Sequence, residues 1–89
     1  MDDVLMGGED LYMILRVTRK STLTELRKAY RKRALMYHPD RNRNVSEITR
    51  ETINEEMRKL NKAKEVLFDP VKRSVYDRWL EGSIIRDQN

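Results

Sequence analysis

The apolar residues of this chain recur every three or four positions, as on one face of an α-helix, and seldom alternate as strand residues do. The clearest stripe follows Thr22 and Glu25, which form a T-x-x-E capping box at a helix start. Pro39 disfavours a helical conformation at His38, so we expect this helix to end near Tyr37. Its apolar face consists of Leu26, Ala29, Tyr30, Ala34 and Tyr37.

Two further stretches fit helices on either side of this one. Asp10 can cap a short first helix in "LYMILRV", where Leu11, Ile14 and Leu15 share one face. Ser46 is a suitable N-cap for a long third helix, whose apolar residues alternate in steps of four and three. That seam consists of Ile53, Met57, Leu60, Ala63 or Lys64, and Leu67. Its spacing predicts lengthwise packing against another helix.

A fourth helix is predicted from Pro70 to Glu81. Asp69 supplies the N-cap, proline is favoured at the first helical position, and Gly82 is interpreted as the stop. The spacing predicts that Val71, Val75 and Trp79 line its inner side.

Composition supports one small all-α domain of four helices. The chain has 89 residues, of which 38% are hydrophobic and another 38% charged, with three glycines and two prolines, so its core must come from a few helical stripes. We expect residues 1–9 to form a flexible lead, residues 10–81 the domain, and residues 82–89 a tail or the start of a linker.

The charge is positive overall, at +4, and unevenly distributed. The first ten residues carry four acids and no base, whereas residues 27–43 carry seven bases and a single acid, Asp40. An acidic partner is therefore plausible. No cysteine and only one histidine are present, which excludes a disulfide framework, a thiol nucleophile and an ordinary zinc site, and no cofactor is expected. Without a secretory signal or a membrane-length apolar span, we expect a cytoplasmic or nuclear protein with no membrane partner.

The segment "YHPDRN" holds the single histidine and directly follows the most basic stretch. A catalytic pair of His38 and Asp40 is disfavoured, because a helical tip in a small domain offers no evident pocket and no nucleophile is spaced to join it. The tripeptide could also be a plain helix-ending turn, with Asp40 accepting local backbone hydrogen bonds. We therefore predict no enzymatic activity, and the tripeptide alone does not identify a function.

The basic face of the second helix, formed by Arg27, Lys28, Arg31 and Lys32, has two further interpretations besides a solvated surface. Glu25 is the only acid between Arg19 and Arg33, so pairing within the helix cannot neutralise this face. It could contact an acidic protein surface, or nucleic-acid phosphates as a basic helical module. Asp40 at the presumed contact tip, and the absence of helix-turn-helix spacing, count against nucleic acid.

The order of these segments resembles the J-domain of DnaJ-type co-chaperones. "DLYMILRVT", "TELRKAYRKRALMYHPDRN" and "MRKLNKAKEVLFDPVKRSVYD" carry the resemblance across about Asp10 to Leu80. It implies four helices, with the second and third as an antiparallel hairpin and the His-Pro-Asp loop at its tip. It also implies docking on a DnaK-type seventy-kilodalton heat-shock chaperone and stimulation of its ATP hydrolysis. We expect a monomer, with no nucleic acid bound.

The resemblance assigns roles to matching positions. The His-Pro-Asp turn maps to His38, Pro39 and Asp40, continued by Arg41 and Asn42, and the chaperone-binding face of the second helix maps to Arg27, Tyr30, Arg31 and Lys32. The "KRxxYD" stretch, Lys72, Arg73, Tyr76 and Asp77, is similar to the signature of the family's fourth helix and is expected to support the fold.

Three departures from the family pattern are visible. Arg16 stands where the family usually has glycine, which costs about 1 kcal/mol if the turn requires a left-handed conformation. Met57 and Lys64 replace phenylalanine and tyrosine, so the core is less aromatic, and the segment after Arg43 is longer than in many bacterial members. None of these departures touches the docking turn.

Overall fold

The computed structural model describes residues 10–87 of the chain, with side chains through residue 82, and this part contains helices and no strand. The predicted all-α fold of four helices is confirmed, and none of these helices is long and apolar enough to cross a membrane. The predicted lead over residues 1–9 lies outside the described residues. The α-helices are α2 (Leu11–Leu15), α3 (Leu23–Met36), α4 (Glu47–Leu67) and α5 (Pro70–Asp87), and a 3-10 turn, η1 (Pro39–Arg41), lies between α3 and α4.

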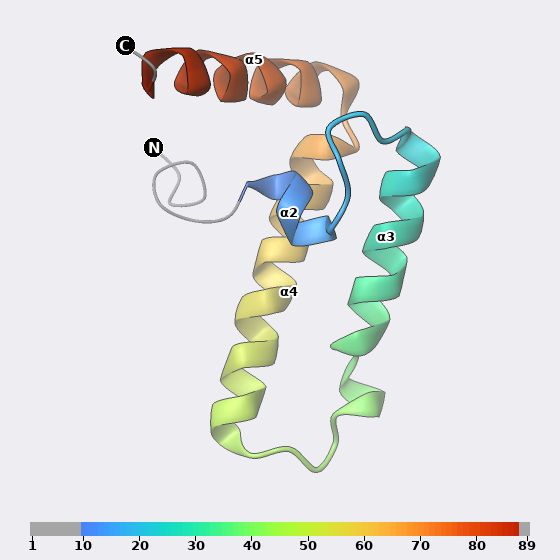
Figure 1. Cartoon of the computed structure of the whole chain (residues 1–89). Helices are drawn as coiled ribbons and strands as arrows, with labels where there is room; N and C mark the ends of the chain where they lie inside the picture. Colours follow the sequence, from blue (N-terminus) through green and yellow to red (C-terminus); the bar gives the residue numbers. More distant parts are fainter. Residues whose placement is uncertain (1–9, 88–89) are drawn as a thin grey trace.

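Helices α3 and α4 form an antiparallel hairpin, which gives the molecule an elongated shape about 48 Å long (Figure 1). The connection that contains η1 lies at one end of the hairpin. Helix α2 packs against both long helices, and α5 crosses at the opposite end, where it packs against α4. The hairpin therefore holds the η1 turn away from the rest of the domain.

The core lies at the α2 and α5 end of the hairpin. Its fully buried leucines come from α2, α3 and α4, and each is expected to contribute about 1.5–3 kcal/mol through burial. The seam predicted for α4 is confirmed, since Leu60, Ala63 and Leu67 are buried and the charged alternative, Lys64, is exposed. The five leucines are Leu11, Leu15, Leu26, Leu60 and Leu67.

The predicted helix starts have the expected capping contacts. The Thr22 hydroxyl accepts a hydrogen bond from the Glu25 backbone N–H at 3.1 Å, and the Glu25 carboxylate accepts one from the Thr22 N–H at 2.7 Å. That backbone hydrogen bond lowers the pKa of the Glu25 carboxyl. The side chains of Asp10 and Ser46 likewise accept a hydrogen bond from the backbone N–H three residues on, at the starts of α2 and α4. Each cap satisfies a backbone donor that the helix itself cannot.

The prediction that Gly82 ends the fourth helix is wrong, because α5 continues to Asp87. A glycine stop depends on a positive φ, whereas none of the glycines in the described residues has one. No proline follows Gly82, so the helix can continue at the moderate cost of one interior glycine.

The inner side predicted for the fourth helix is also wrong. Val71 and Val75 are 72% and 60% exposed, whereas Tyr76 is 6% exposed and belongs to the core. Trp79, the third residue of that prediction, does pack against the core, as does Leu80. Two valines four positions apart resemble an inward stripe, but α5 is rotated so that Tyr76 is buried and polar side chains contact α2.

Polar contacts connect α2 and α5. The Tyr12 hydroxyl donates to Asp77 Oδ1 at 2.6 Å and accepts from Arg73 Nε at 2.9 Å, while the Tyr76 hydroxyl accepts from the Leu11 backbone N–H at 2.8 Å. Arg73 also donates to the backbone carbonyls of the loop between α2 and α3. The "KRxxYD" stretch therefore contributes directly to the fold, and we call the group of Tyr12, Arg73, Tyr76 and Asp77 the α2–α5 clasp.

The turn that leaves α2 adopts the left-handed conformation considered for Arg16. This residue has φ 58° and ψ 48°, and among the described residues it is the only non-glycine with positive φ. Its backbone N–H donates to the Met13 carbonyl at 3.0 Å, and the next N–H donates to the Tyr12 carbonyl. Because arginine has a Cβ atom, this conformation costs about 1 kcal/mol of folding free energy that glycine would avoid.

Candidate functional site

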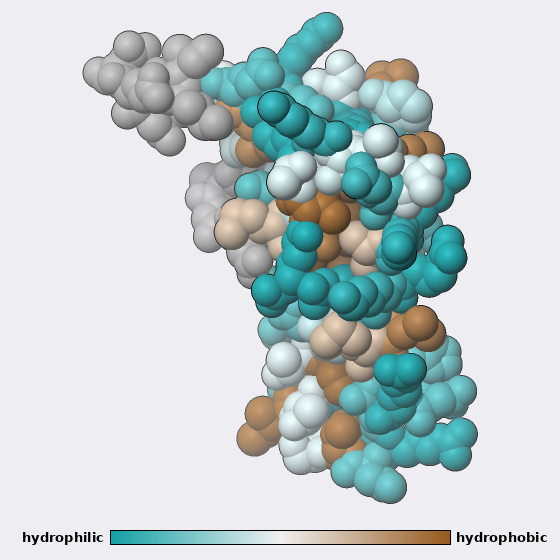
Figure 2. All heavy atoms as spheres, turned by 45° about the vertical axis from the view of Figure 1, so that its right-hand side comes forward, coloured by the Kyte–Doolittle hydropathy of each residue, from teal (hydrophilic) through white to brown (hydrophobic). Residues whose placement is uncertain are grey.

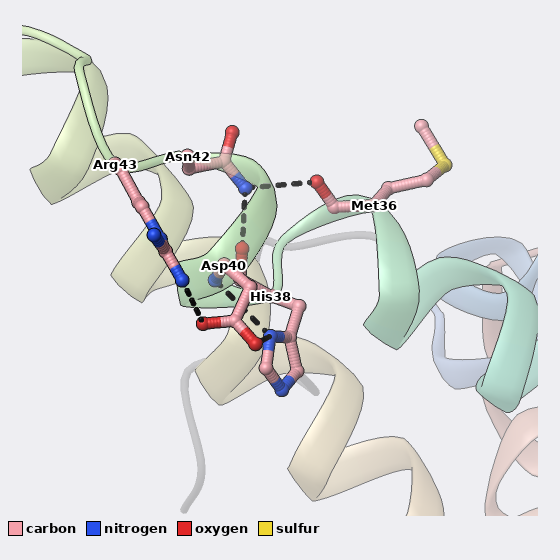
Figure 3. A network of polar contacts seen from close by, with 5 residues as sticks. All are labelled: Met36, His38, Asp40, Asn42 and Arg43. Carbon is pink, nitrogen blue, oxygen red and sulfur yellow. Dashed lines mark hydrogen bonds and ion pairs between the residues drawn. The ribbon is translucent and has the colours of Figure 1, made fainter.

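The "HPD" turn is an ordered 3-10 turn at the tip of the hairpin. His38 is its N-cap, and the imidazole Nδ1 accepts a hydrogen bond from the Asp40 backbone N–H at 3.2 Å (Figure 3). Because Nδ1 accepts this bond, the proton of a neutral imidazole belongs on Nε2. Pro39 occupies the first position of the turn, where its fixed φ and missing N–H are well tolerated. The imidazole is half exposed and can present an Nε2–H donor.

Asn42 fastens this turn to the end of α3. Its side-chain Nδ2 donates to the Met36 carbonyl at 3.1 Å and to the His38 carbonyl at 2.8 Å (Figure 3). The bond to Met36 satisfies a carbonyl that the end of α3 leaves open, and the bond to His38 adds to the one that its carbonyl accepts from the Arg41 N–H. The orientation of the tip therefore depends on Asn42 as well as on Pro39.

Asp40 is exposed and only weakly engaged. Its carboxylate lies 3.4 Å from Arg43 Nη2 and 3.8 Å from His38 Nδ1, the latter an ion pair only when the imidazole is protonated. The side chains of Asp40 and Arg43 are 72% and 74% exposed, so their pair contributes less than about 1 kcal/mol. A stronger cationic partner could displace Arg43 at little cost.

The basic face of α3 remains unpaired within the described part of the chain. Arg27, Lys28, Arg31 and Lys32 are all exposed, and none makes an ion pair with a described acid. Figure 2, which brings the α3 side forward, shows hydrophilic side chains over much of this face with hydrophobic surface between them. The face therefore presents positive charge available to an external acid.

Tyr30 differs from the other predicted contact residues of α3. Its hydroxyl donates to Asn61 Oδ1 at 2.9 Å, and its ring makes an edge contact with Phe68 at a centroid distance of 5.8 Å. Lys64 Nζ lies 5.2 Å from the ring centroid. The ring is partly buried against α4, so Tyr30 joins the two helices and offers only part of its surface to a partner.

The structure thus brings His38, Pro39, Asp40, Arg41 and Asn42 together in one turn, while the predicted residues of α3 follow one another along the hairpin. Sequence reasoning missed the Arg43 contact and a cavity of about 320 Å³ behind the turn, partly walled by Tyr37, Pro39 and Val45. It also left Leu35 and Met36 without partners, and both are nearly half exposed beside the tip. Their position off the apolar stripe was the signal that could have placed them at the surface.

The described residues show no group of three or more His, Cys, Asp or Glu side chains placed to hold a metal ion. The tip instead combines an imidazole, an exposed carboxylate and a rigid backbone next to a positive helix. This arrangement suits recognition of a protein surface that carries both charges.

Comparison with known proteins agrees with the fold. The family described as DnaJ domain matches residues 10–77. The chain is 45% identical over 74 residues to the Chaperone protein DnaJ of Dichelobacter nodosus, covering 83% of this chain and 19% of that protein. It is 45% identical over 81 residues to the Chaperone protein DnaJ of a Sulfurovum species, covering 86% and 20%. The chain spans about a fifth of the length of these relatives.

Proposed function

The chain belongs to the DnaJ-domain family of co-chaperones, and we therefore propose that it docks on a DnaK-type heat-shock chaperone and stimulates its ATP hydrolysis. The observation that carries the proposal is the tip, where His38 and Asp40 are exposed on a turn fixed by Pro39 and Asn42. The chain acts as a monomer, without catalytic chemistry or a cofactor of its own. Its location in the cytoplasm or nucleus stays a prediction, and the relatives, which are bacterial, give no support for the nucleus.

The tip supplies a preformed contact. Pro39 restricts the turn before binding, and Asn42 ties it to α3, so little conformational entropy is lost on docking. Asp40 exchanges its weak pair with Arg43 for a cation on the chaperone, while the imidazole Nε2–H of His38 donates to an acceptor there. Contacts made more strongly with the hydrolysing state than with the resting state shift the chaperone toward hydrolysis.

The basic face of α3 brings the two proteins together. Arg27, Arg31 and Lys32 attract an acidic chaperone surface, which raises the association rate more than the final affinity and loses effect as salt screens the charges. Arg41 extends the positive surface to the tip. Tyr30 contributes the exposed part of its ring and keeps α3 in place against α4.

A basic nucleic-acid-binding module remains the alternative, and it depends on the same face of α3. Phosphates would contact these side chains, yet Asp40 presents a carboxylate at the leading end of that surface, where it would repel them. Titration of a labelled DNA duplex at several salt concentrations tests this alternative. Saturable binding at physiological salt would favour it over the chaperone.

The replacement His38→Gln tests the proposal in a single-turnover ATPase assay with a DnaK-type chaperone. His38 is half exposed and outside the core, so the variant should keep its melting temperature. We expect the hydrolysis rate to return to that of the chaperone alone, because glutamine does not reproduce the position of the imidazole Nε2–H.

The matched control is Asn44→Ala, which changes an exposed residue of the same connection whose side chain makes no hydrogen bond with a described residue. It should stimulate as the wild-type chain does. Wild-type stimulation by the His38 variant, or no stimulation by the wild-type chain with any DnaK-type chaperone, would overturn the proposed function.

A further inference from the structure

A second positive feature lies where the end of α2 meets the side of α3. A hollow of about 340 Å³ opens there, and its lining includes four cationic side chains, one from the end of α2 and three from α3. These are Arg16, Lys28, Lys32 and Arg33. We call this feature the α2–α3 hollow.

The charge of the α2–α3 hollow is not neutralised from within. Glu25 is the one acid in its lining, and its carboxylate already accepts the capping hydrogen bond from the Thr22 N–H. None of the four cationic side chains pairs with an acid among the described residues, and Arg33 has only a 3.8 Å contact from Nη1 to the Met36 sulfur. Four like charges around one opening repel one another unless an anion enters.

Arg16 holds this position at a cost to the backbone. It adopts the left-handed conformation that glycine accepts without strain, and its exposed side chain makes no polar contact with a described residue that would compensate. Residues held in sparsely populated backbone conformations concentrate at functional sites. The left-handed backbone ends α2, but glycine could do the same without strain, so the guanidinium group is the feature that needs an explanation.

We propose that the α2–α3 hollow binds a carboxylate side chain of the DnaK-type chaperone, with Arg16 as the principal contact. The planar guanidinium groups of Arg16 and Arg33 can each donate two parallel hydrogen bonds to a carboxylate. Lys28 and Lys32 add positive charge at the rim. Docking thereby extends from α3 to the end of α2.

Continuity favours this occupant over a free anion. Lys32 belongs both to the lining of the hollow and to the basic face proposed to meet the chaperone, and Lys28 lies on that same exposed side of α3. A partner seated on α3 would therefore place its own side chains at the opening. The inference rests on the proposed function and adds the contact at the end of α2.

Two replacements of Arg16 separate its charge from its strain. Arg16→Gln removes the charge but keeps a side chain in the left-handed turn, whereas Arg16→Gly removes both. Single-turnover stimulation of the DnaK-type chaperone is measured against the concentration of each variant, at low and high salt. We expect both to raise the half-saturating concentration about two- to fivefold at low salt, with a smaller effect at high salt. Arg16→Gly should do so although its melting temperature rises by a few degrees.

Arg58→Gln is the matched control, since it makes the same charge change at an exposed position of α4, on the side opposite the buried seam. It should leave the half-saturating concentration unchanged.

The inference would be overturned if both Arg16 variants had the same half-saturating concentration as Arg58→Gln. The proposed function would remain intact in that case. Half-saturating concentrations that shift in opposite directions for Arg16→Gln and Arg16→Gly would overturn the inference too. Docking would then depend on the stability of the domain and not on the charge of Arg16. If added glutamate and added phosphate reduced stimulation equally at matched ionic strength, the hollow would be a site for free anions. That result would also contradict the inference. Loss of all stimulation by the wild-type chain would instead overturn the proposed function, and the inference with it.

Discussion

Tyr76 shows how much one hydroxyl group contributes when, among the described residues, it is the only partner of a buried backbone donor. The ring is 6% exposed, and its oxygen accepts the hydrogen bond of the Leu11 N–H, which belongs to the unpaired first turn of α2. Tyr76→Phe would keep the ring and leave that N–H buried without an acceptor. We expect a loss of about 1–3 kcal/mol in the free energy of unfolding, measured by urea denaturation.

Tyr30→Phe is the matched control, because it also removes a tyrosine hydroxyl group, but one that is exposed. Water can replace the lost bond to Asn61, so its cost should stay below about 1 kcal/mol. If the two variants lost the same stability, the Leu11 N–H would have another partner in solution.

Helix starts could be predicted from this sequence, whereas the rotation of α5 could not. Thr22, Ser46 and Asp10 fix helix starts through contacts within one turn, so a local pattern is enough to identify them. The rotation of α5 depends on contacts between residues more than sixty positions apart, such as the hydrogen bond from Tyr12 to Asp77. No local pattern contains that information, and the two exposed valines therefore gave a wrong inner side.

Part of the candidate site could likewise be predicted from the sequence, and part could not. The turn at the tip was predictable, because Pro39 limits both itself and the residue before it. The α2–α3 hollow was not, since it requires the end of α2 and one side of α3 to be brought together in space. The left-handed conformation considered for Arg16 came from the family pattern and gave no indication of the residues around it.

The extension of α5 beyond Glu81 leads to a prediction about Gly82. This residue lies inside the helix with a negative φ, so a methyl group would restrict the unfolded chain without straining the folded one. We expect Gly82→Ala to stabilise the domain by about 0.5–1 kcal/mol, measured by thermal unfolding. Gly82→Pro should instead lower the helical circular dichroism signal. An unchanged signal for the proline variant would mean that the helix ends near Glu81.

The tip that we propose to contact the chaperone and the contacts that close the domain lie at opposite ends of the hairpin. The α2–α5 clasp joins the beginning of the domain to α5, far from η1 (Figure 1). The tip can therefore remain exposed and weakly paired without loosening the core. Variants at the tip should change activity, and variants in the clasp should change stability.

The clasp also predicts how stability depends on alkaline pH. Burial, followed by the hydrogen bond to Asp77, raises the pKa of Tyr12 from 10.0 to about 12, and burial raises the pKa of Tyr76 as well. In the unfolded chain both hydroxyls return to a pKa near about 10. The unfolded state therefore loses protons first as the pH rises, which favours unfolding. The contribution from Tyr12 is complete below pH 10 and is lost as the pH rises to about 12.

Urea unfolding of the wild-type chain and of Tyr12→Phe between pH 8 and about pH 11.5 measures this effect. The variant lacks the hydroxyl and should be less stable at pH 8, because the bonds to Arg73 and Asp77 are gone. Its stability should nevertheless fall less steeply above pH 10, so the two curves converge. Lysines titrate in the same range in both proteins, and their contribution cancels to first order in the comparison. Parallel curves would show that the Tyr12 hydroxyl titrates alike in the folded and unfolded chains, and that the clasp does not hold its proton.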